Sequence, residues 1–137
     1  MLISVDPLDA GLRAALADEG LPVSDLGADH QRMWCDVVDG KAVGYGGIER
    51  HGDAALLRSL VILPDHKGRG HGAALVAQIV AEAGVAELWL LTNTAAAFFA
   101  RLGWTVRDRA DAPPAIAASA EFASLCPASA VCMSYRV

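Results

Sequence analysis

The sequence predicts an α/β fold in which a mixed, twisted sheet of about six to seven strands carries helices on both faces. Three observations lead to this prediction. Two strand-like runs meet at Asp39-Gly40, a strong signal for a two-residue hairpin. The apolar run LLRSLVI then passes through a glycine-rich junction into the apolar segment ALVAQIVAEAG, as when a strand gives way to a helix. Strand-like and helix-like segments alternate from there to the end of the chain.

The first half of the chain predicts one helix among four strands. Residues 1–5 read as a strand. Asp6 then offers an N-cap and Pro7 a first helical residue, which predicts a helix over 7–19 that Gly20 ends. The polar segment 21–31 predicts a loop. The next three strands are expected at 33–38, 42–50 and 54–62. In the last of them, alternation predicts one side made of Leu56, Arg58, Leu60 and Ile62.

The second half predicts helices alternating with strands. Residues 70–83 are apolar on nearly every side, so we expect a helix buried against the sheet and ended by Gly84. Pro113-Pro114 predicts a short helix that continues through Phe122. The other expected elements are a strand at 87–91, a helix at 95–101 ended by Gly103, a strand at 104–107 and a closing strand at 131–136.

The composition is that of a globular protein and argues against several partners. A length of 137 residues suits a single domain over residues 1–137, and a hydrophobic fraction of 54% excludes disorder. The net charge of −5, with no basic face, argues against nucleic acid and anionic membrane as partners. No apolar run approaches the ~18 residues of a membrane span, and no signal peptide is visible. Three cysteines without zinc-like spacing predict thiols in the cytoplasm and no metal site: Cys35, Cys126 and Cys132.

The glycine-rich junction, LPDHKGRGHGAAL at residues 63–75, predicts a diphosphate cradle. A helix that starts where a strand ends presents unpaired N–H groups and a positive dipole end, and glycines let a phosphate approach them. Lys67, Arg69 and His71 add positive charge. A P-loop is excluded because Gly68 is followed by Arg69, and the glycine spacing does not fit a dinucleotide site. A plain connector remains the alternative.

These residues resemble a known family. The stretch LVILPDHKGRGHG at 60–72 resembles the acetyl-CoA motif of the GNAT N-acetyltransferases. That motif is a strand ending in V-x-P, then Arg or Gln, two residues, Gly, one residue, and Gly or Ala. Lys67, Gly70 and Gly72 occupy its marked positions, with Lys67 a conservative departure. The stretch TNTAAAFFARLGW at 92–104 is similar to the family's second helix and its LGF ending.

The resemblance covers most of the chain and implies the GNAT (acyl-CoA N-acyltransferase) fold, with acetyl-CoA as acetyl donor. It implies that the backbone of the fourth strand pairs with the pantetheine arm and that amides of the junction hold the pyrophosphate. The thioester is expected beside Leu91 and Thr92, where the fourth and fifth strands splay apart. The residues expected at the coenzyme are Leu60, Val61, Ile62, Lys67, Gly68, Arg69, Gly70, His71, Gly72 and Ala73.

Acetyl transfer to an amine needs a proton acceptor and a proton for the leaving thiolate. Glu49 is the candidate base, because it ends a strand of small residues next to the expected splay; the alternative is a solvated strand-end acid. Many relatives supply the proton from a tyrosine, and that position corresponds here to Phe99, which has none to give. Water, Thr92 or Asn93 would then serve, or catalysis would be mainly positioning.

Arg58 is the candidate substrate-binding residue. An arginine in an apolar strand needs an anion, and its fork suits a carboxylate. An internal ion pair with Asp36 or Glu49 is the equal alternative. LRSLVI together with LLTNTAAAFFARLGW is similar to the acetyltransferase domain of glutamate N-acetyltransferases, in which an arginine at the place of Arg58 serves the substrate carboxylate.

The C-terminal segment 109–133 makes the chain similar to the small GNAT proteins linked to bacterial arsenic resistance. Cys126 would be either a thiol for an arsenical or a buried residue that shapes the closing loop. We therefore expect an enzyme, monomer or homodimer, that acetylates the amine of a small, carboxylate-bearing or amino-acid-like molecule. The alternatives are a non-catalytic acyl-CoA-binding or sensor module and an acetyltransferase of a protein amine.

Overall fold

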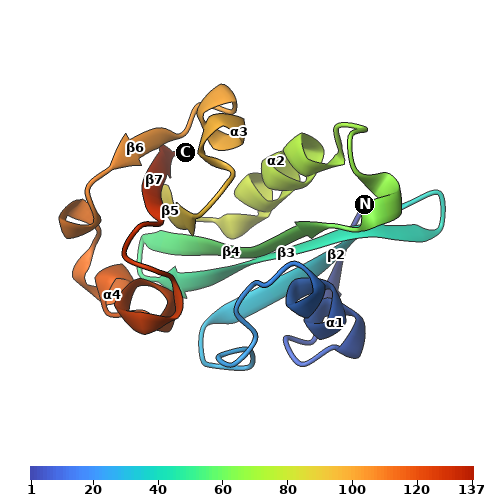
Figure 1. Cartoon of the computed structure of the whole chain (residues 1–137), viewed down its shortest axis with the longest axis horizontal. Helices are drawn as coiled ribbons and strands as arrows, with labels where there is room; N and C mark the ends of the chain where they lie inside the picture. Colours follow the sequence, from blue (N-terminus) through green and yellow to red (C-terminus); the bar gives the residue numbers. More distant parts are fainter. The chain divides into compact units, whose positions relative to one another are not determined.

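A computed structural model describes residues 1–137 and confirms the predicted fold class. Seven strands are hydrogen-bonded in the order β1-β2-β3-β4-β5-β7-β6 (Figure 1). β4 and β5 run parallel, whereas β1–β2, β2–β3, β5–β7 and β6–β7 are antiparallel, so the sheet is mixed. The chain divides into two compact units, Met1–Glu49 with Leu57–Gly84 and Arg50–Leu56 with Val85–Val137. Strands β3 and β4 contribute residues to both units.

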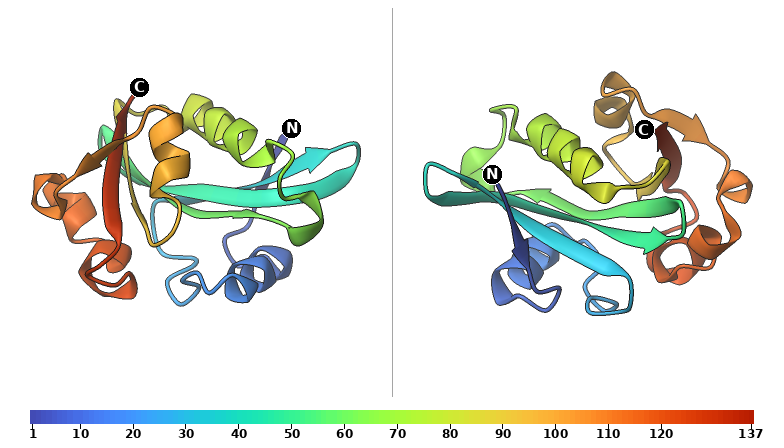
Figure 2. Two further views of the ribbon diagram at one scale, coloured as in Figure 1. Left: turned by 45° about the horizontal axis from the view of Figure 1, so that its top comes forward. Right: turned by 180° about the vertical axis from the view of Figure 1, so that it is seen from behind.

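The first unit is built on strands covered by a helix on each face. Figures 1 and 2 show α1 and α2 on opposite faces of β2, β3 and β4. Neither these nor any other helices of the structure are long and apolar enough to cross a membrane. The elements that contribute to this unit are β1 (Leu2–Val5), α1 (Ala10–Asp18), β2 (Gln31–Val38), β3 (Lys41–His51), β4 (Ala54–Ile62), η1 (Pro64–His66) and α2 (His71–Ala83).

Apolar side chains fill both faces of this unit. On the α1 face, Leu12 and Leu16 are buried in one cluster with Met33, Tyr45 and Val61. On the α2 face, small residues of β3 allow the helix to lie close to the strand. A Cβ placed on Gly46 would lie 2.5 Å from Ile79 Cδ1 and 3.1 Å from Leu60 Cδ1. Gly44 and Gly46 flank Tyr45. Atoms of β4 and α2 occupy the space that a side chain at these two positions would need.

Helix α1 begins later than the sequence predicts. Asp6 does not cap the helix. Its Oδ1 accepts a hydrogen bond of 2.8 Å from the Leu8 N–H, within a local turn. Asp9 is the N-cap instead, and its Oδ2 accepts from the Leu12 N–H at 3.0 Å. The error arose because two aspartates lie three positions apart and both suit a cap, so local preference does not distinguish them. The predicted end of the helix at residue 19 is within one residue of the observed end at Asp18. Gly20 follows with a positive φ of 69°.

The second unit pairs its strands around another apolar cluster. Figure 1 shows α3 and α4 on opposite sides of β5 and β7. The cluster joins the start of β4, through Ala54 and Leu56, to Trp89, Ile116 and Phe122. The remaining elements of this unit are β5 (Glu87–Thr92), α3 (Ala96–Arg101), β6 (Thr105–Arg107), η2 (Arg109–Asp111), α4 (Pro114–Ala117), η3 (Glu121–Leu125) and β7 (Val131–Arg136).

The helix predicted from Pro113 through Phe122 is not continuous. It ends at Ala117, and a separate π-helical turn follows at Glu121–Leu125. The Ser119 hydroxyl donates to the Ile116 carbonyl at 2.6 Å, and the Ser119 N–H donates to the same carbonyl. Such local side-chain bonds compete with the helical ladder, which explains the break.

Strand β4 does not alternate as predicted, because Ser59 interrupts it. Ser59 has a φ of +59°, a conformation rare in a non-glycine residue and typical of a β-bulge. Arg58 bonds to Glu49 and Val61 packs in the α1-face cluster, whereas Leu60 faces Gly46 and α2. Arg58 therefore does not share a face with Leu60. The strand switches sides at Ser59, and the α1 face continues from Arg58 to Val61.

The close packing around β3 predicts a stability effect at Gly47. A Cβ there would lie 2.1 Å from Met33 Sδ and 2.7 Å from the Arg32 carbonyl oxygen, and the second neighbour is backbone. Gly47→Ala should lower the free energy of unfolding by about 1–3 kcal/mol in urea denaturation. Gly40→Asn is the control, because a Cβ there meets no atom within 4 Å and asparagine tolerates a positive φ. Equal stability of the two variants would contradict the packing described.

Candidate active site

The N-terminus of α2 has the features of an anion site. Gly68 and Gly70 have φ values of 78° and 80°, and a Cβ added at either would meet no atom within 4 Å. Gly70 is the N-cap, and no side chain caps the helix. The Ala74 N–H makes the first intrahelical bond, to the Gly70 carbonyl at 3.3 Å. The amides of residues 71–73 precede that bond and lie at the positive end of a thirteen-residue helix, so they are placed to bind a phosphate.

The cations of the junction have different surroundings. Lys67 Nζ lies 2.6 Å from Glu19 Oε1, and the two side chains are 52% and 36% exposed. Pairs of this kind contribute little to stability and exchange readily, so Lys67 can change partners. Arg69 is exposed. The His71 ring packs edge-on against His66, with 6.0 Å between ring centroids.

The main chain of Leu60–Ile62 lies beyond the β4–β5 ladder. That ladder consists of the pairs Ala54–Glu87 to Leu56–Trp89. The bulge at Ser59 follows, and the strand ends where the Leu63 N–H donates to the Val43 carbonyl at 2.9 Å. This arrangement is consistent with the expectation that backbone groups of Leu60–Ile62 bind an extended ligand as an added strand would.

A buried ionic cluster surrounds Arg58 on the α1 face of the first unit. The guanidinium binds the Asp25 carboxylate through two nitrogens, Nη1 to Oδ2 at 2.5 Å and Nη2 to Oδ1 at 2.7 Å. Nη1 also donates to Glu49 Oε2 at 3.2 Å, and Nε donates to Ser59 Oγ at 3.2 Å. The Arg58 side chain has 0% exposure, so its charge depends on these partners.

The structure thus brings together two of the predicted site residues, Arg58 and Glu49. Of the two ion-pair partners expected for Arg58, Glu49 is present. Asp36 instead binds the terminal amine of Met1 at 2.9 Å. Asp25 was missed, although the need of Arg58 for an anion was recognised. Asp25 lies 33 residues upstream in a loop, and no spacing rule connects a loop residue to a strand residue at that distance.

Thr92, Asn93 and Phe99 belong to the second unit. Thr92 Oγ1 accepts from the Ala95 N–H at 3.0 Å, which leaves its own hydroxyl proton available for donation. Asn93 is exposed in the turn that follows β5. Phe99 is buried in α3, and its ring lies 5.5 Å from that of Trp104. A side chain in this apolar contact provides packing and no proton.

None of the three cysteines is in a disulfide. Burial raises the pKa of the Cys35 thiol, and the hydrogen bond with Tyr45 offsets this only in part. Burial also raises the pKa of the Cys132 thiol, against the lowering effect of Arg109 and Arg107.

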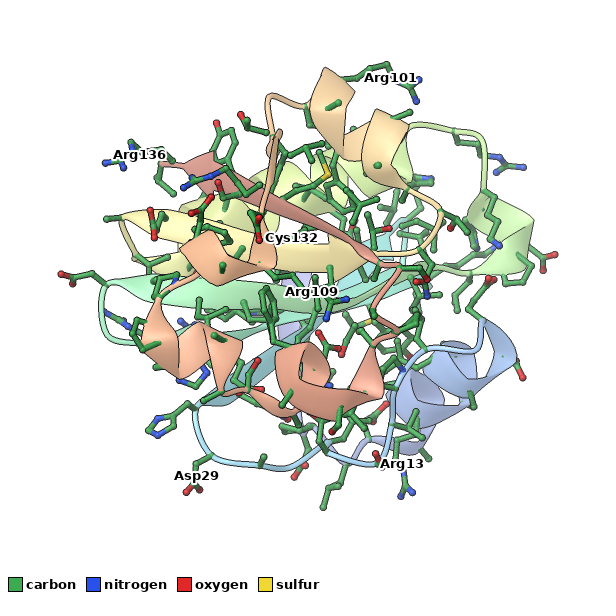
Figure 3. The ribbon with its side chains drawn as sticks, turned by 60° about the vertical axis from the view of Figure 1, so that its left-hand side comes forward. Arg13, Asp29, Arg101, Arg109, Cys132 and Arg136 are labelled. Atoms are coloured by element: carbon green, nitrogen blue, oxygen red, sulfur yellow. The ribbon has the colours of Figure 1, made fainter.

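Arg109 donates to the Phe122 and Pro127 carbonyls and holds the end of η3, while its Nε is buried without a partner (Figure 3). No group of three or more His, Cys, Asp and Glu residues is placed to hold a metal ion.

Together, the strand order and the glycine junction opening α2 define the class. A mixed sheet whose fourth strand leads through a glycine-rich turn into a helix that buries one side, through Leu75, Val76, Ile79 and Ala83, is the architecture expected for acyl-CoA N-acyltransferases; the helix is not buried on every side as predicted. The chain belongs to the GNAT acetyltransferases, because residues 29–106 match the model of the acetyltransferase (GNAT) domain. Residues 29–106 therefore form an acetyltransferase (GNAT) domain of this family.

One curated relative is similar over a short stretch. The mycothiol acetyltransferase of Nocardiopsis dassonvillei is 40% identical over 53 residues, which cover 39% of this chain. The same stretch is only 16% of the length of that protein.

Solved structures agree over nearly the whole chain. Rv2747 from Mycobacterium tuberculosis, crystallised with CoA, has a TM-score of 0.79 at 19% identity, and the match covers 100% of this chain and 99% of that one. The N-acetylglutamate synthase of Neisseria gonorrhoeae, crystallised with coenzyme A and N-acetyl-glutamate, has a TM-score of 0.74 at 16% identity. That match covers 99% of this chain and 35% of the synthase. At these identities, the structures support the fold alone.

The different burial of the thiols predicts their order of reaction. A chromogenic disulfide reagent at neutral pH should label Cys126 first, because Cys126 is only partly buried. Cys35 and Cys132 are buried with raised pKa values, so little reactive thiolate forms. They should react only on unfolding or at clearly higher pH. Absorbance would follow the reaction, and a fast phase that persists in Cys126→Ser would show this burial pattern to be wrong.

Proposed function

We propose that this chain is an acetyl-CoA-dependent N-acetyltransferase, acting as a single domain on the amine of a small, amino-acid-like or carboxylate-bearing molecule. The observation that carries the proposal is the combination, in one compact unit, of an anion-binding helix terminus with a buried arginine already shaped around a carboxylate. The first feature suits the donor and the second suits the acceptor.

The coenzyme would be held mainly by backbone groups. The amides of residues 68–73 would bind the pyrophosphate, since Gly68 and Gly70 leave the space beside them open. Lys67 and Arg69 would add charge around it, with Lys67 exchanging its exposed partner Glu19 for phosphate oxygens. Backbone groups of Leu60–Ile62 would bind the pantetheine arm beyond the bulge at Ser59.

The chemistry assigned to side chains is proton transfer. When bound, acetyl-CoA supplies an activated acetyl thioester. Glu49, fixed at Oε2 by Arg58, would accept the proton that the ammonium form of the acceptor must lose. The Thr92 hydroxyl, whose oxygen already accepts from Ala95, would serve as donor to the leaving thiolate, with Asn93 as the alternative. Phe99 takes no part in proton transfer.

The contacts of Arg58 support the proposed class of acceptor. Asp25 occupies both terminal nitrogens, which demonstrates that this guanidinium accommodates a carboxylate in a bidentate arrangement. The synthase from Neisseria gonorrhoeae, a neighbour in fold, was crystallised with N-acetyl-glutamate, and the same class of acceptor is proposed here. A link to arsenic resistance rests only on the sequence resemblance of residues 109–133. Three cysteines without a disulfide among them support a cytoplasmic location.

The second candidate function is a non-catalytic acyl-CoA-binding module. The observation in its favour is the buried phenylalanine at position 99, where many relatives carry the tyrosine acid. The presence of Glu49 and Arg58 on the face of β3 and β4 opposite α2 favours the enzyme instead, because a coenzyme sensor has no need of them. Turnover of any small amine would exclude the module.

The coenzyme site predicts a charge effect at Gly70. Asparagine and aspartate both tolerate the positive φ of this residue and have nearly the same shape. The charge of Gly70→Asp beside a phosphate costs about 1–4 kcal/mol at 4 Å. Gly70→Asp should therefore bind CoA roughly five- to a thousandfold more weakly than Gly70→Asn in titration calorimetry. Equal affinities would mean that the phosphates lie elsewhere, and no heat from the unaltered protein with CoA or acetyl-CoA would refute the proposed activity.

The proposed role of Glu49 as the base predicts a loss of turnover without a loss of acetyl-CoA binding. Coenzyme release would be measured with a panel of amino acids and their amides as acceptors. Glu49→Gln keeps the shape of the side chain and removes its basicity, so kcat should fall by about a hundredfold or more. The affinity for acetyl-CoA should not change. The matched control is Glu82→Gln, which alters an exposed glutamate of α2 and should keep full activity. A Glu49→Gln enzyme with normal kcat would exclude this residue as the base.

A further inference from the structure

The contact between Asp25 and Arg58 reproduces the geometry of a bound ligand carboxylate. Both Asp25 oxygens meet the two terminal guanidinium nitrogens, at 2.5 and 2.7 Å. This side-by-side arrangement is the one by which arginine recognises free carboxylates. Ser59, the next residue of the same strand, and Glu49 of β3 hold the guanidinium, so its orientation is fixed before any ligand arrives.

A buried arginine needs a carboxylate at all times, which explains why one is supplied by the chain. The Arg58 side chain is fully buried, and loss of the bidentate Asp25 carboxylate would weaken the neutralisation of its charge, to which Glu49 also contributes at 3.2 Å. A site that was empty between turnovers would therefore carry a stability cost. If one carboxylate replaces another, the buried charge does not change, and the exchange avoids that cost.

Asp25 differs from the other partners in being carried by a loop. Glu49 and Ser59 belong to strands, whereas Asp25 lies in the turn between α1 and β2. The backbone of this turn is anchored at Asp25 and at the two residues that follow it. Gln31 Nε2 donates to the Asp25 carbonyl, and Gln31 Oε1 accepts from the Gly27 N–H, both at 3.0 Å. Leu26 is buried in the α1-face cluster. The Asp25 carboxylate can thus leave by rotation of its own side chain, with the turn in place.

We propose that Asp25 is a specificity-determining residue that fills the Arg58 fork in the free protein and is displaced by the carboxylate of the acceptor. This inference rests on the proposed acetyltransferase function. Only an acceptor with a carboxylate can replace Asp25, so an amine without one leaves the fork closed and gains nothing from Arg58. Asp25 acts as an internal competitor that sets a threshold for the affinity of carboxylate-bearing amines.

The test is Asp25→Asn with pairs of acceptors, each an amino acid and its own amide. A competitor that fills a site for nine-tenths of the time raises the apparent dissociation constant about tenfold, so its loss should lower the KM of the amino acid by roughly that factor. The KM of the amide and the affinity for acetyl-CoA should not change. Asp29→Asn is the matched control, since Asp29 lies in the same loop, is exposed and points away from the sheet (Figure 3).

An unchanged ratio of amino-acid to amide KM in Asp25→Asn would overturn the inference and leave the ion pair as a purely structural contact. If that variant does not fold, NMR spectra of the unaltered protein with the amino acid and with its amide test the inference instead. The Leu26 amide and the Arg58 Nε–H resonances should shift with the amino acid and not with the amide. No shift at saturating amino acid would also overturn it. These resonances need no turnover, so failure of acetyl-CoA to bind while the amino acid still shifts them would refute the proposed function alone.

Discussion

The structure around the candidate site depends on the neutralisation of one buried charge. Arg58 lies inside the first unit, and its guanidinium connects β4 to β3 through Glu49 and to the loop after α1 through Asp25. An unpaired guanidinium in this position would be incompatible with a stable core, so the loop and both strands must keep their places. The same requirement orients Glu49, the proposed base. Stability and proposed chemistry therefore share one set of contacts.

The bulge at Ser59 lies between this cluster and the backbone proposed to bind the coenzyme. Without an interruption, Arg58 and Leu60 would lie on one face. With it, Arg58 and Val61 face α1, while Leu60 faces α2. The strand thus carries Arg58, the proposed acceptor-binding residue, on one face and, a few residues later, presents main chain that is not engaged by the β5 ladder. The positive φ of Ser59 is a local strain that the contact with Arg58 Nε helps to hold.

The helix terminus provides the other half of the proposed site by a different physical route. Its attraction for phosphate comes from aligned amides and from glycines that leave space, and it requires no specific side chain. Lys67 and Arg69 contribute from the solvent side, where charge is screened and partners exchange. A substitution of the side chains of the junction is therefore tolerated more easily than a change of its glycines. This is consistent with a departure from the family motif at Lys67 in a chain that belongs to the family.

The sequence by itself determined the order of elements, the hairpin at Asp39-Gly40, the closing strand and the glycine junction, because hydrophobic period and turn residues are local properties. It also determined that Arg58 needs an anion. Only the tertiary structure decided that Asp25 supplies it, that Asp9 caps α1, and that β4 changes face at Ser59. Each of these choices is made by contacts between segments distant in the chain or by competition between equally suited residues, and neither leaves a periodic trace in the sequence.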